Sequence, residues 1–336
     1  MKQAMFQETR EEKKVQCSLC SHRCLILPGK RGICGVRENN DGILYTLVYD
    51  KVIARHVDPI EKKPLFHFLP GSQSFSIATP GCNFHCRHCQ NADISQLPRD
   101  RDGMIVGEAM TPRQIVDAAL AAGCDSISYT YTEPTIYFEL AYDTARIAAG
   151  AGLKNVFVSN GYITPEALRE IKPYLHAANI DLKGYTDEFY KKVCGARLQP
   201  VLDAIRLYRE LGIWIEITTL VIPGHNDSDD DLKGIAQFIK SVGEDIPWHV
   251  SRFHPTYKLT DKPVTPVETL KRARRIGLNA GLRYVYEGNI LGEGEDTVCW
   301  SCRKTLVKRI GFSVRETAIK DGTCGFCGVP IAGVWE

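Results

Sequence analysis

Three cysteines lie close together in the stretch TPGCNFHCRHCQN, residues 79–91, directly after an apolar run that is typical of a strand. Cys82, Cys86 and Cys89 follow a C-x3-C-x2-C spacing, which places three thiols on one short loop. A [4Fe-4S] cluster held by protein alone takes four cysteines, so this loop would leave one iron without a protein ligand. An open metal position permits catalysis, as at catalytic zinc. A zinc or disulfide loop is the alternative, but a structural zinc site needs four ligands.

Two further groups of four cysteines flank this loop. The N-terminal group comprises Cys17, Cys20, Cys24 and Cys34, and the C-terminal group comprises Cys299, Cys302, Cys324 and Cys327. Four thiolates favour closed, structural sites, and the two C-terminal C-x2-C pairs have a spacing close to that of a zinc ribbon. For the N-terminal group we expect zinc or, as the alternative, an auxiliary iron–sulfur cluster. Cys124 and Cys194 stand alone and are predicted to be buried apolar side chains.

The bulk composition excludes several classes of partner. The chain has 336 residues, 44% of them hydrophobic, and its 42 basic against 40 acidic residues give a net charge of +2. Such a balance favours neither nucleic acid nor an anionic membrane surface as partner. The charged N-terminus lacks the apolar core of a signal peptide, and no apolar run is long enough to span a membrane. We therefore expect a cytoplasmic protein in which eleven of the thirteen cysteines, those of the three groups, serve metal sites rather than disulfides.

Strand-like and helix-like runs alternate from residue 75 to residue 286. Strands are expected at 75–78, 126–130, 155–158, 178–182, 213–220, 249–253 and 284–286, and helices at 111–122, 136–149, 165–171, 201–211, 229–242 and 266–280. This alternation predicts an α/β fold with a parallel sheet, closed as a partial (β/α) TIM-type barrel of about six βα units. We expect a metal-binding segment and β cap at residues 1–70, the barrel at 71–290 and a zinc-ribbon-like segment at 291–336.

Three other segments also allow expectations. Residues 42–57 alternate apolar and polar side chains, which predicts a hairpin or a pair of short strands that caps the barrel. Charged residues usually lie on solvated faces, so we expect solvent exposure for Glu61, Lys62 and Lys63 and for Lys304, Lys308 and Arg309.

The reactive face of a parallel barrel is formed by the loops that follow the strands. The polar residues that stand out in this chain lie at or just after the ends of the predicted strands, and they are Glu133, Ser159, Asn160, Asp181, Lys183 and His254. Gly161 follows Asn160 and would let the backbone approach a ligand closely. We therefore expect one binding site at this edge of the sheet.

The cysteine loop resembles the signature of the radical S-adenosylmethionine (SAM) superfamily, in which the open iron binds SAM and reduces it to a 5′-deoxyadenosyl radical. The motifs EP, SNG, DLK and PGHND at 133–134, 159–161, 181–183 and 223–227 resemble the activators of glycyl radical enzymes, such as pyruvate formate-lyase activating enzyme. The segments CSLCSHRC, GKRGICGVR, DPIEKKPLFHFLPGS, YTYTEPT and YVYEGNI, with the terminal cysteine pairs, resemble the AmmeMemoRadiSam system radical SAM enzymes across nearly the whole chain.

The resemblance implies a role for each matched residue. Cys82, Cys86 and Cys89 would hold the catalytic [4Fe-4S] cluster, and the SAM contacts would come from Glu133, Ser159, Asn160, Gly161, Asp181, Lys183 and His254. His88 stands where the usual signature has an aromatic residue, so it would lie beside the adenine. Glu133 would accept from the SAM ammonium group, and Lys183 would pair with its carboxylate.

The resemblance also implies a reaction and partners. The radical would abstract hydrogen from a substrate that the sequence does not identify. Reduced ferredoxin or flavodoxin would donate the electron, and Memo-type and AMMECR-type proteins would be partners. Two alternatives remain at this point. One is a glycyl radical enzyme-activating enzyme, and the other is a non-catalytic zinc-binding interaction module.

Overall fold

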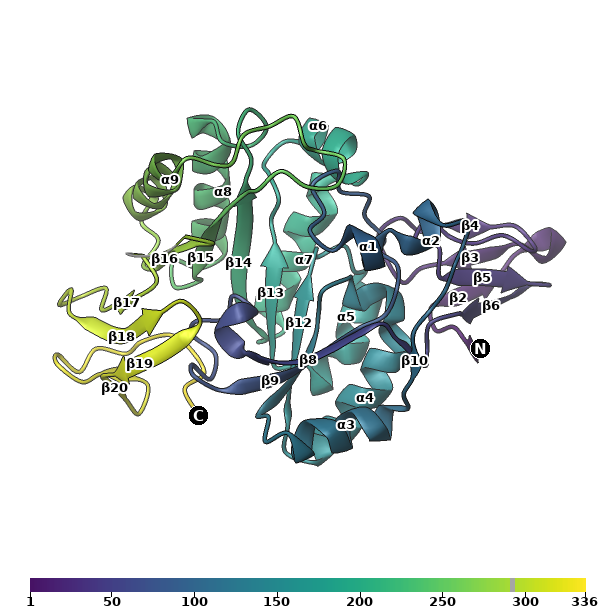
Figure 1. Ribbon diagram of the computed structural model, residues 1–336, viewed down its shortest axis with the longest axis horizontal. Coiled ribbons are helices and arrows are strands. Elements are labelled where there is room, and N and C mark those ends of the chain that lie inside the picture. The colour runs from purple at the N-terminus through teal and green to yellow at the C-terminus, as the bar shows by residue number, and fades with distance from the viewer. Residues whose placement is uncertain (291–293) are drawn as a thin grey trace.

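The computed structural model describes residues 1–290 and 294–336, and an eight-stranded sheet lies at its centre (Figure 1). The strands run in the order β16-β15-β14-β13-β12-β11-β9-β8. Their bounds are β8 (Ala54–Pro59), β9 (Gln73–Ala78), β11 (Ser126–Tyr129), β12 (Lys154–Ser159), β13 (Ala177–Asp181), β14 (Trp214–Val221), β15 (Trp248–Arg252) and β16 (Val285–Gly288). Seven of them, β9 and β11 to β16, are parallel, as the sequence predicts.

Helices connect the parallel strands and cover the sheet. They are α3 (Pro112–Ala121), α4 (Phe138–Gly150), α5 (Pro165–Ile171), α7 (Leu198–Glu210), α8 (Asp229–Val242) and α9 (Val267–Ala280), within a few residues of the predicted ranges. Thr111 begins α3 with a reciprocal capping box to Gln114, and Ser228 caps α8 ahead of three aspartates. No helix in the described part of the chain is both long and apolar enough to cross a membrane.

Residues 42–57 do not form the predicted hairpin. β6 (Ile43–Thr46) pairs with β1 (Lys2–Gln3) and β5 (Arg37–Asn40), and β7 (Lys51–Val52) pairs with β10 (Glu108–Ala109). β8 pairs antiparallel with β9, so residues 54–59 belong to the central sheet rather than to a separate cap. Alternation predicts strands but not their partners, and β8 satisfies the backbone groups of β9 that would otherwise form a free edge.

The two cysteine-rich segments lie at opposite ends of the molecule (Figure 1). The N-terminal segment contains a sheet of β2 (Gln7–Thr9), β3 (Val15–Cys17) and β4 (Leu25–Ile26). The C-terminal segment contains β17 (Thr297–Val298), β18 (Thr305–Ile310), β19 (Ser313–Thr317), β20 (Ile319–Lys320) and β21 (Thr323–Cys324). The predicted boundary between residues 290 and 291 borders residues 291–293, which lie outside the described residues.

A buried polar network attaches the C-terminal segment to the sheet. The Arg309 guanidinium donates to the Phe66 carbonyl at 2.7 Å and lies 3.6 Å from a Glu61 carboxylate oxygen. The ring nitrogens of His67 lie 2.7 Å from the Ala332 carbonyl oxygen and 2.6 Å from the Tyr286 hydroxyl. Glu61 and Arg309 are therefore buried, and the predicted solvated face is wrong for both, because each charge has an opposite charge within reach.

The docking of this segment should depend on pH through His67. Burial lowers the pKa of His67 from 6.5 to about 4, so between these values the unfolded chain binds a proton that the folded chain does not. The free energy of unfolding should therefore fall as the pH drops from 7 to 5, with this residue contributing about 2 kcal/mol. Chemical denaturation followed by tryptophan fluorescence measures it, and His67→Gln should flatten the dependence. His56→Gln, at an exposed ring, is the control, and an equal flattening there would contradict the assignment.

Candidate functional site

A cavity of about 520 Å³ opens at the carboxyl ends of the parallel strands. Its volume suits a small-molecule ligand. Of the predicted site residues, the structure brings nine to its wall, namely Cys82, Cys86, His88, Cys89, Glu133, Ser159, Asn160, Asp181 and Lys183. Among the described residues, the wall includes neither His254, which is exposed, nor Gly161. Gly161 has a φ of 73°, and a Cβ there would lie 2.9 Å from Ile180, so the turn requires glycine.

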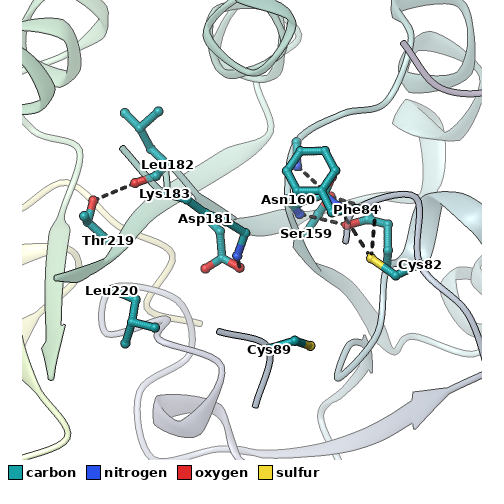
Figure 2. Close-up of polar contacts among 12 residues, drawn as sticks. Cys82, Phe84, Cys89, Ser159, Asn160, Asp181, Leu182, Lys183, Thr219 and Leu220 are labelled. Atoms are coloured by element: carbon teal, nitrogen blue, oxygen red, sulfur yellow. Dashed lines mark hydrogen bonds and ion pairs between the residues drawn. The ribbon is translucent and has the colours of Figure 1, made fainter. Parts of the chain in front are cut away.

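The three cysteines of the central loop line the cavity together. The Phe84 backbone N–H donates to the Cys82 sulfur at 3.3 Å, and the Ser95 hydroxyl lies 3.1 Å from the Cys89 sulfur. Figure 2 shows Cys82 and Cys89 on two separate stretches of the loop, near the strand ends that carry Ser159, Asn160 and Asp181. Burial raises the pKa of both thiols above the usual value. Neutral buried thiols of this kind ionise when a cation binds them.

The spacing of the sulfurs distinguishes the three cysteine groups. In the described part of the chain, ligand atoms that all lie within 4.8 Å of one another occur in two sets, Cys299, Cys302, Cys324 and Cys327, and Cys86, His88 and Cys194. The central trio forms no such set. Thiolates on a cubane are held apart by iron and sulfide, whereas thiolates on one zinc ion lie about 3.8 Å apart. Among the described residues, the trio by itself is therefore not a compact set of the kind that one ion requires.

Cys194 is a neighbour of the site that the sequence did not identify. It lies in a π-helical turn, Tyr190–Cys194, which follows α6 (Asp187–Phe189), and it is fully buried as predicted. Its thiol lies within 4.8 Å of the Cys86 sulfur and lowers the pKa of Cys86 through a hydrogen bond. No sequence motif marks this cysteine, because only the fold brings the turn behind the central loop.

Glu133 is the most extensively bonded side chain in the cavity wall. Its carboxylate accepts from the Ser159 hydroxyl at 2.8 Å, the Asn160 backbone N–H at 2.8 Å and the Thr135 hydroxyl at 2.6 Å. Burial raises the pKa of Glu133 above its usual value, although these hydrogen bonds oppose the shift. Asn160 donates from Nδ2 to the Asn83 side chain at 2.7 Å. This chain of bonds connects the ends of β11 and β12 to the cysteine loop.

A lysine–aspartate pair projects from the end of β13. Lys183 Nζ lies 2.8 Å from Asp181 Oδ2, and the pair faces the cysteines (Figure 2). Burial alone would lower the pKa of Lys183, but Asp181 and, to a smaller extent, Cys86 and Cys194 raise it well above the usual value. Thr219 on β14 donates to the Leu182 carbonyl at 2.8 Å and so holds this segment in place. The cavity therefore contains a fixed cation beside the cysteine trio.

His88 is buried in the cavity wall, on the loop that carries the three cysteines. Its ring lies 6.4 Å from that of Phe189 and almost parallel to it. Burial lowers the pKa of His88 to about 3, and the nearby charges of Lys183 and His225 contribute, so the ring is neutral at pH 7. A neutral imidazole packed on a phenyl ring can serve as the flat group that an aromatic residue would otherwise supply.

A second charged group in the wall was missed, because the run 61–63 was expected to be solvated. Lys63 is only 2% exposed, and its Nζ lies 2.6 Å from Asp58 Oδ2. The Tyr131 hydroxyl donates to the same carboxylate oxygen. Burial lowers the pKa of Lys63 to about 8. Burial alone would raise the pKa of Asp58, but hydrogen bonds from Lys62, Lys63 and Tyr131 lower it below the usual range. Strand β8 brings this group to the cavity, and periodicity could not predict its position.

Comparisons with known proteins agree with this geometry. Residues 76–239 match the Radical SAM superfamily. The chain is 48% identical over 335 residues to an uncharacterized protein of Methanocaldococcus jannaschii, covering 98% of this chain and 99% of that protein. It is 21% identical over 212 residues to the pyruvate formate-lyase 1-activating enzyme of Escherichia coli, covering 58% of this chain and 85% of the enzyme.

Solved structures show the same fold at low sequence identity. A radical SAM methyltransferase from Sphaerobacter thermophilus superposes with a TM-score of 0.51 at 15% identity, covering 66% of this chain and 67% of that chain. SuiB from Streptococcus suis, bound to its precursor peptide SuiA, gives 0.51 at 15% identity over 69% of this chain and 51% of that chain. These likenesses concern the fold alone.

The Asp58–Lys63 pair gives a test of the wall. Asp58→Asn would leave the buried ammonium of Lys63 without a counter-charge, so the free energy of unfolding should fall by about 3 to 5 kcal/mol. Denaturant titration measures the loss. Asp117→Asn, which breaks an exposed pair with Arg113, should cost no more than about 1 kcal/mol. Equal effects of the two substitutions would contradict the importance of the buried pair.

Proposed function

The chain belongs to the radical SAM superfamily, and from its site we propose that it is a radical SAM enzyme with a [4Fe-4S] cluster on Cys82, Cys86 and Cys89. The observation that carries the proposal is the trio itself, whose three cysteines together line an open cavity beside Glu133, Asp181 and Lys183. When bound and reduced, the cluster supplies the electron that cleaves SAM to methionine and a 5′-deoxyadenosyl radical, which takes hydrogen from a substrate. We interpret the sheet, whose end strands are β8 and β16, as a partial (β/α) barrel.

The charged residues of the wall would orient SAM. Lys183 has three N–H donors and uses one on Asp181, which leaves donors for the SAM carboxylate. The Glu133 carboxylate would accept from the SAM ammonium group, and buried charge-assisted contacts of this kind are strong. His88 would pack against the adenine. These residues hold their positions through bonds to neighbouring strands, so little ordering would be needed when SAM binds.

Ser159 and Asn160 divide their roles in this proposal. The Ser159 hydroxyl donates to Glu133 and accepts from the Gly161 backbone N–H at 3.0 Å, so it positions the carboxylate. Asn160 Nδ2 donates to Asn83 at 2.7 Å and makes a long contact with the Cys82 sulfur at 3.9 Å. When SAM binds, the donor of this longer contact would turn to a ribose hydroxyl. His254 lies outside the cavity wall, and the proposal gives it no cofactor contact.

We further propose that the chain is an AmmeMemoRadiSam-type enzyme whose substrate is not identified. It would act in the cytoplasm with Memo-type and AMMECR-type partners and with reduced ferredoxin or flavodoxin as electron donor. The similarity to pyruvate formate-lyase 1-activating enzyme favours a second candidate, in which the hydrogen comes from a glycyl residue of a partner protein. Electron paramagnetic resonance of such a partner after turnover distinguishes the two, because only the second candidate leaves a stable protein radical.

Reconstituted, reduced protein should convert SAM to 5′-deoxyadenosine, measured by chromatography. Cys86→Ala should abolish the product, because the cluster would lose one of its three protein ligands. Glu133→Gln removes the charge but keeps the shape, so it should weaken SAM binding by roughly 10-fold or more, in line with a lost charge-assisted contact. Cys124→Ala, a buried cysteine outside the site, is the control. Undiminished product from Cys86→Ala would overturn the proposal.

We propose that the C-terminal cysteines bind zinc. The Cys299–Cys327 and Cys302–Cys324 sulfur distances are 3.7 Å and 3.8 Å, the edges of a tetrahedron around one zinc ion. Purified protein should contain about one zinc per chain at this site, and Cys324→Ala/Cys327→Ala should lose it. Elemental analysis measures the content, again with Cys124→Ala as control. Full zinc retention in the double variant would contradict the assignment.

A further inference from the structure

Four cysteines of the N-terminal segment surround a second, smaller cavity. Its volume is about 20 Å³, and it is lined by Cys17, Cys20, Cys24 and Cys34 together with Leu19, Ile26, Ile33 and Ile136. This volume admits a water-sized group. Four thiolates at the zinc–sulfur distance of about 2.3 Å would enclose the ion alone and leave no such space. The N-terminal sulfurs therefore surround room for something larger than one ion.

The contrast with the C-terminal group supports this conclusion within one molecule. The C-terminal sulfurs all lie within 4.8 Å of one another, whereas no three of the N-terminal cysteines form such a set among the described residues. Both groups consist of four thiols, so the difference is one of geometry and not of ligand type. A group with several metal ions, bridged by sulfide, needs the wider arrangement.

A buried arginine beside this cavity is incompletely bonded. Arg37 lines the cavity and is only 1% exposed. Its Nη2 donates to the Met5 carbonyl at 2.5 Å and to Glu139 at 2.9 Å, but Nε and Nη1 have no partner. Buried donors without acceptors are costly. Sulfide and thiolate sulfurs of a bound anionic cluster would accept from them, and such bonds tune the potential of iron–sulfur clusters.

The N-terminal cysteines pack directly against the central loop. The His22 Nε2 atom lies 2.8 Å from the carbonyl oxygen of Asn83, the residue that follows Cys82. Gly81, which precedes Cys82, has a φ of 103°, and a Cβ there would lie 3.1 Å from the Cys34 carbonyl oxygen. Cys34 of the N-terminal group thus lies against Gly81, the residue before Cys82, and His22 is bonded to Asn83, the residue after it. A structural zinc site would not require this proximity.

We infer that Cys17, Cys20, Cys24 and Cys34 hold an iron–sulfur cluster that relays single electrons to the cysteine trio at the cavity. An external low-potential one-electron donor is oxidised, the N-terminal cluster is reduced and then reoxidised, and the electron arrives at the trio's cluster. No bond forms or breaks, and no proton moves. The relay role rests on the proposed function, whereas the identity of the N-terminal group does not.

The identity is tested by metal content. The Cys82→Ala/Cys86→Ala/Cys89→Ala variant removes the trio's cluster, and after anaerobic purification it should retain about two to four irons per chain with equal sulfide. It should also give an electron paramagnetic resonance signal after reduction with dithionite. The zinc content of this variant should correspond to the C-terminal site alone, about one zinc per chain. Absence of iron and sulfide, with a second zinc per chain, would overturn the inference even if the wild type cleaves SAM.

The relay is tested by the choice of reductant. In Cys17→Ala/Cys20→Ala, the rate of 5′-deoxyadenosine formation with reduced flavodoxin, divided by the rate with dithionite, should collapse relative to wild type. An unchanged ratio would overturn the relay.

Arg37→Lys gives a second test, which remains available if Cys17→Ala/Cys20→Ala misfolds. It keeps the charge but removes the unpartnered donors, so it should lower the midpoint potential of the N-terminal cluster, measured in the variant that lacks the trio. An unchanged potential would contradict a contact between Arg37 and a cluster. If the wild type forms no 5′-deoxyadenosine with either reductant, the proposed function is refuted. The metal content of the variant that lacks the trio then still decides whether the N-terminal cysteines hold an iron–sulfur cluster.

Discussion

The parallel pairing of β9, β11, β12 and β13 is the constraint on which the site depends. Parallel strands end at one edge, so the residues that follow each strand meet there although they are far apart in sequence. Ser159 thereby reaches Glu133 across two neighbouring strand ends, and Asn160 reaches Asn83 in the cysteine loop. A shift in register would separate these pairs, because alternate residues of a strand point to opposite faces.

Buried charge is the second organising feature. Glu133, Lys63, and Asp181 with Lys183 lie in the cavity wall, and Asp58 supports Lys63 from behind it. Each of these groups has an oppositely charged partner or several hydrogen bonds. Burying ions in this way adds little net stability, since desolvation offsets the attraction. Its effect is to hold fixed charges in a site from which water can be excluded, where they act strongly on a charged ligand.

The three cysteine groups use the same ligand in three geometries. The C-terminal group is compact and is attached to the sheet by Arg309 and His67. The N-terminal group is wider and is bonded to the central loop through His22. The central trio faces the large cavity. Placement at the two ends of the molecule gives the flanking groups different neighbours (Figure 1). In the described part of the chain, the N-terminal group is bonded to the loop that carries the trio.

Much of this protein follows from local sequence. Apolar runs and capping residues predicted all seven parallel strands and their helices, and the cysteine spacings marked each group, because both signals depend on near neighbours in the chain. Long-range pairing was not predictable in this way. The antiparallel β8, the buried Asp58–Lys63 pair and the position of Cys194 behind Cys86 arise from contacts between distant segments. The distances between sulfurs, which separate one ion from a cluster, depend on how loops pack, and spacing in sequence does not determine them.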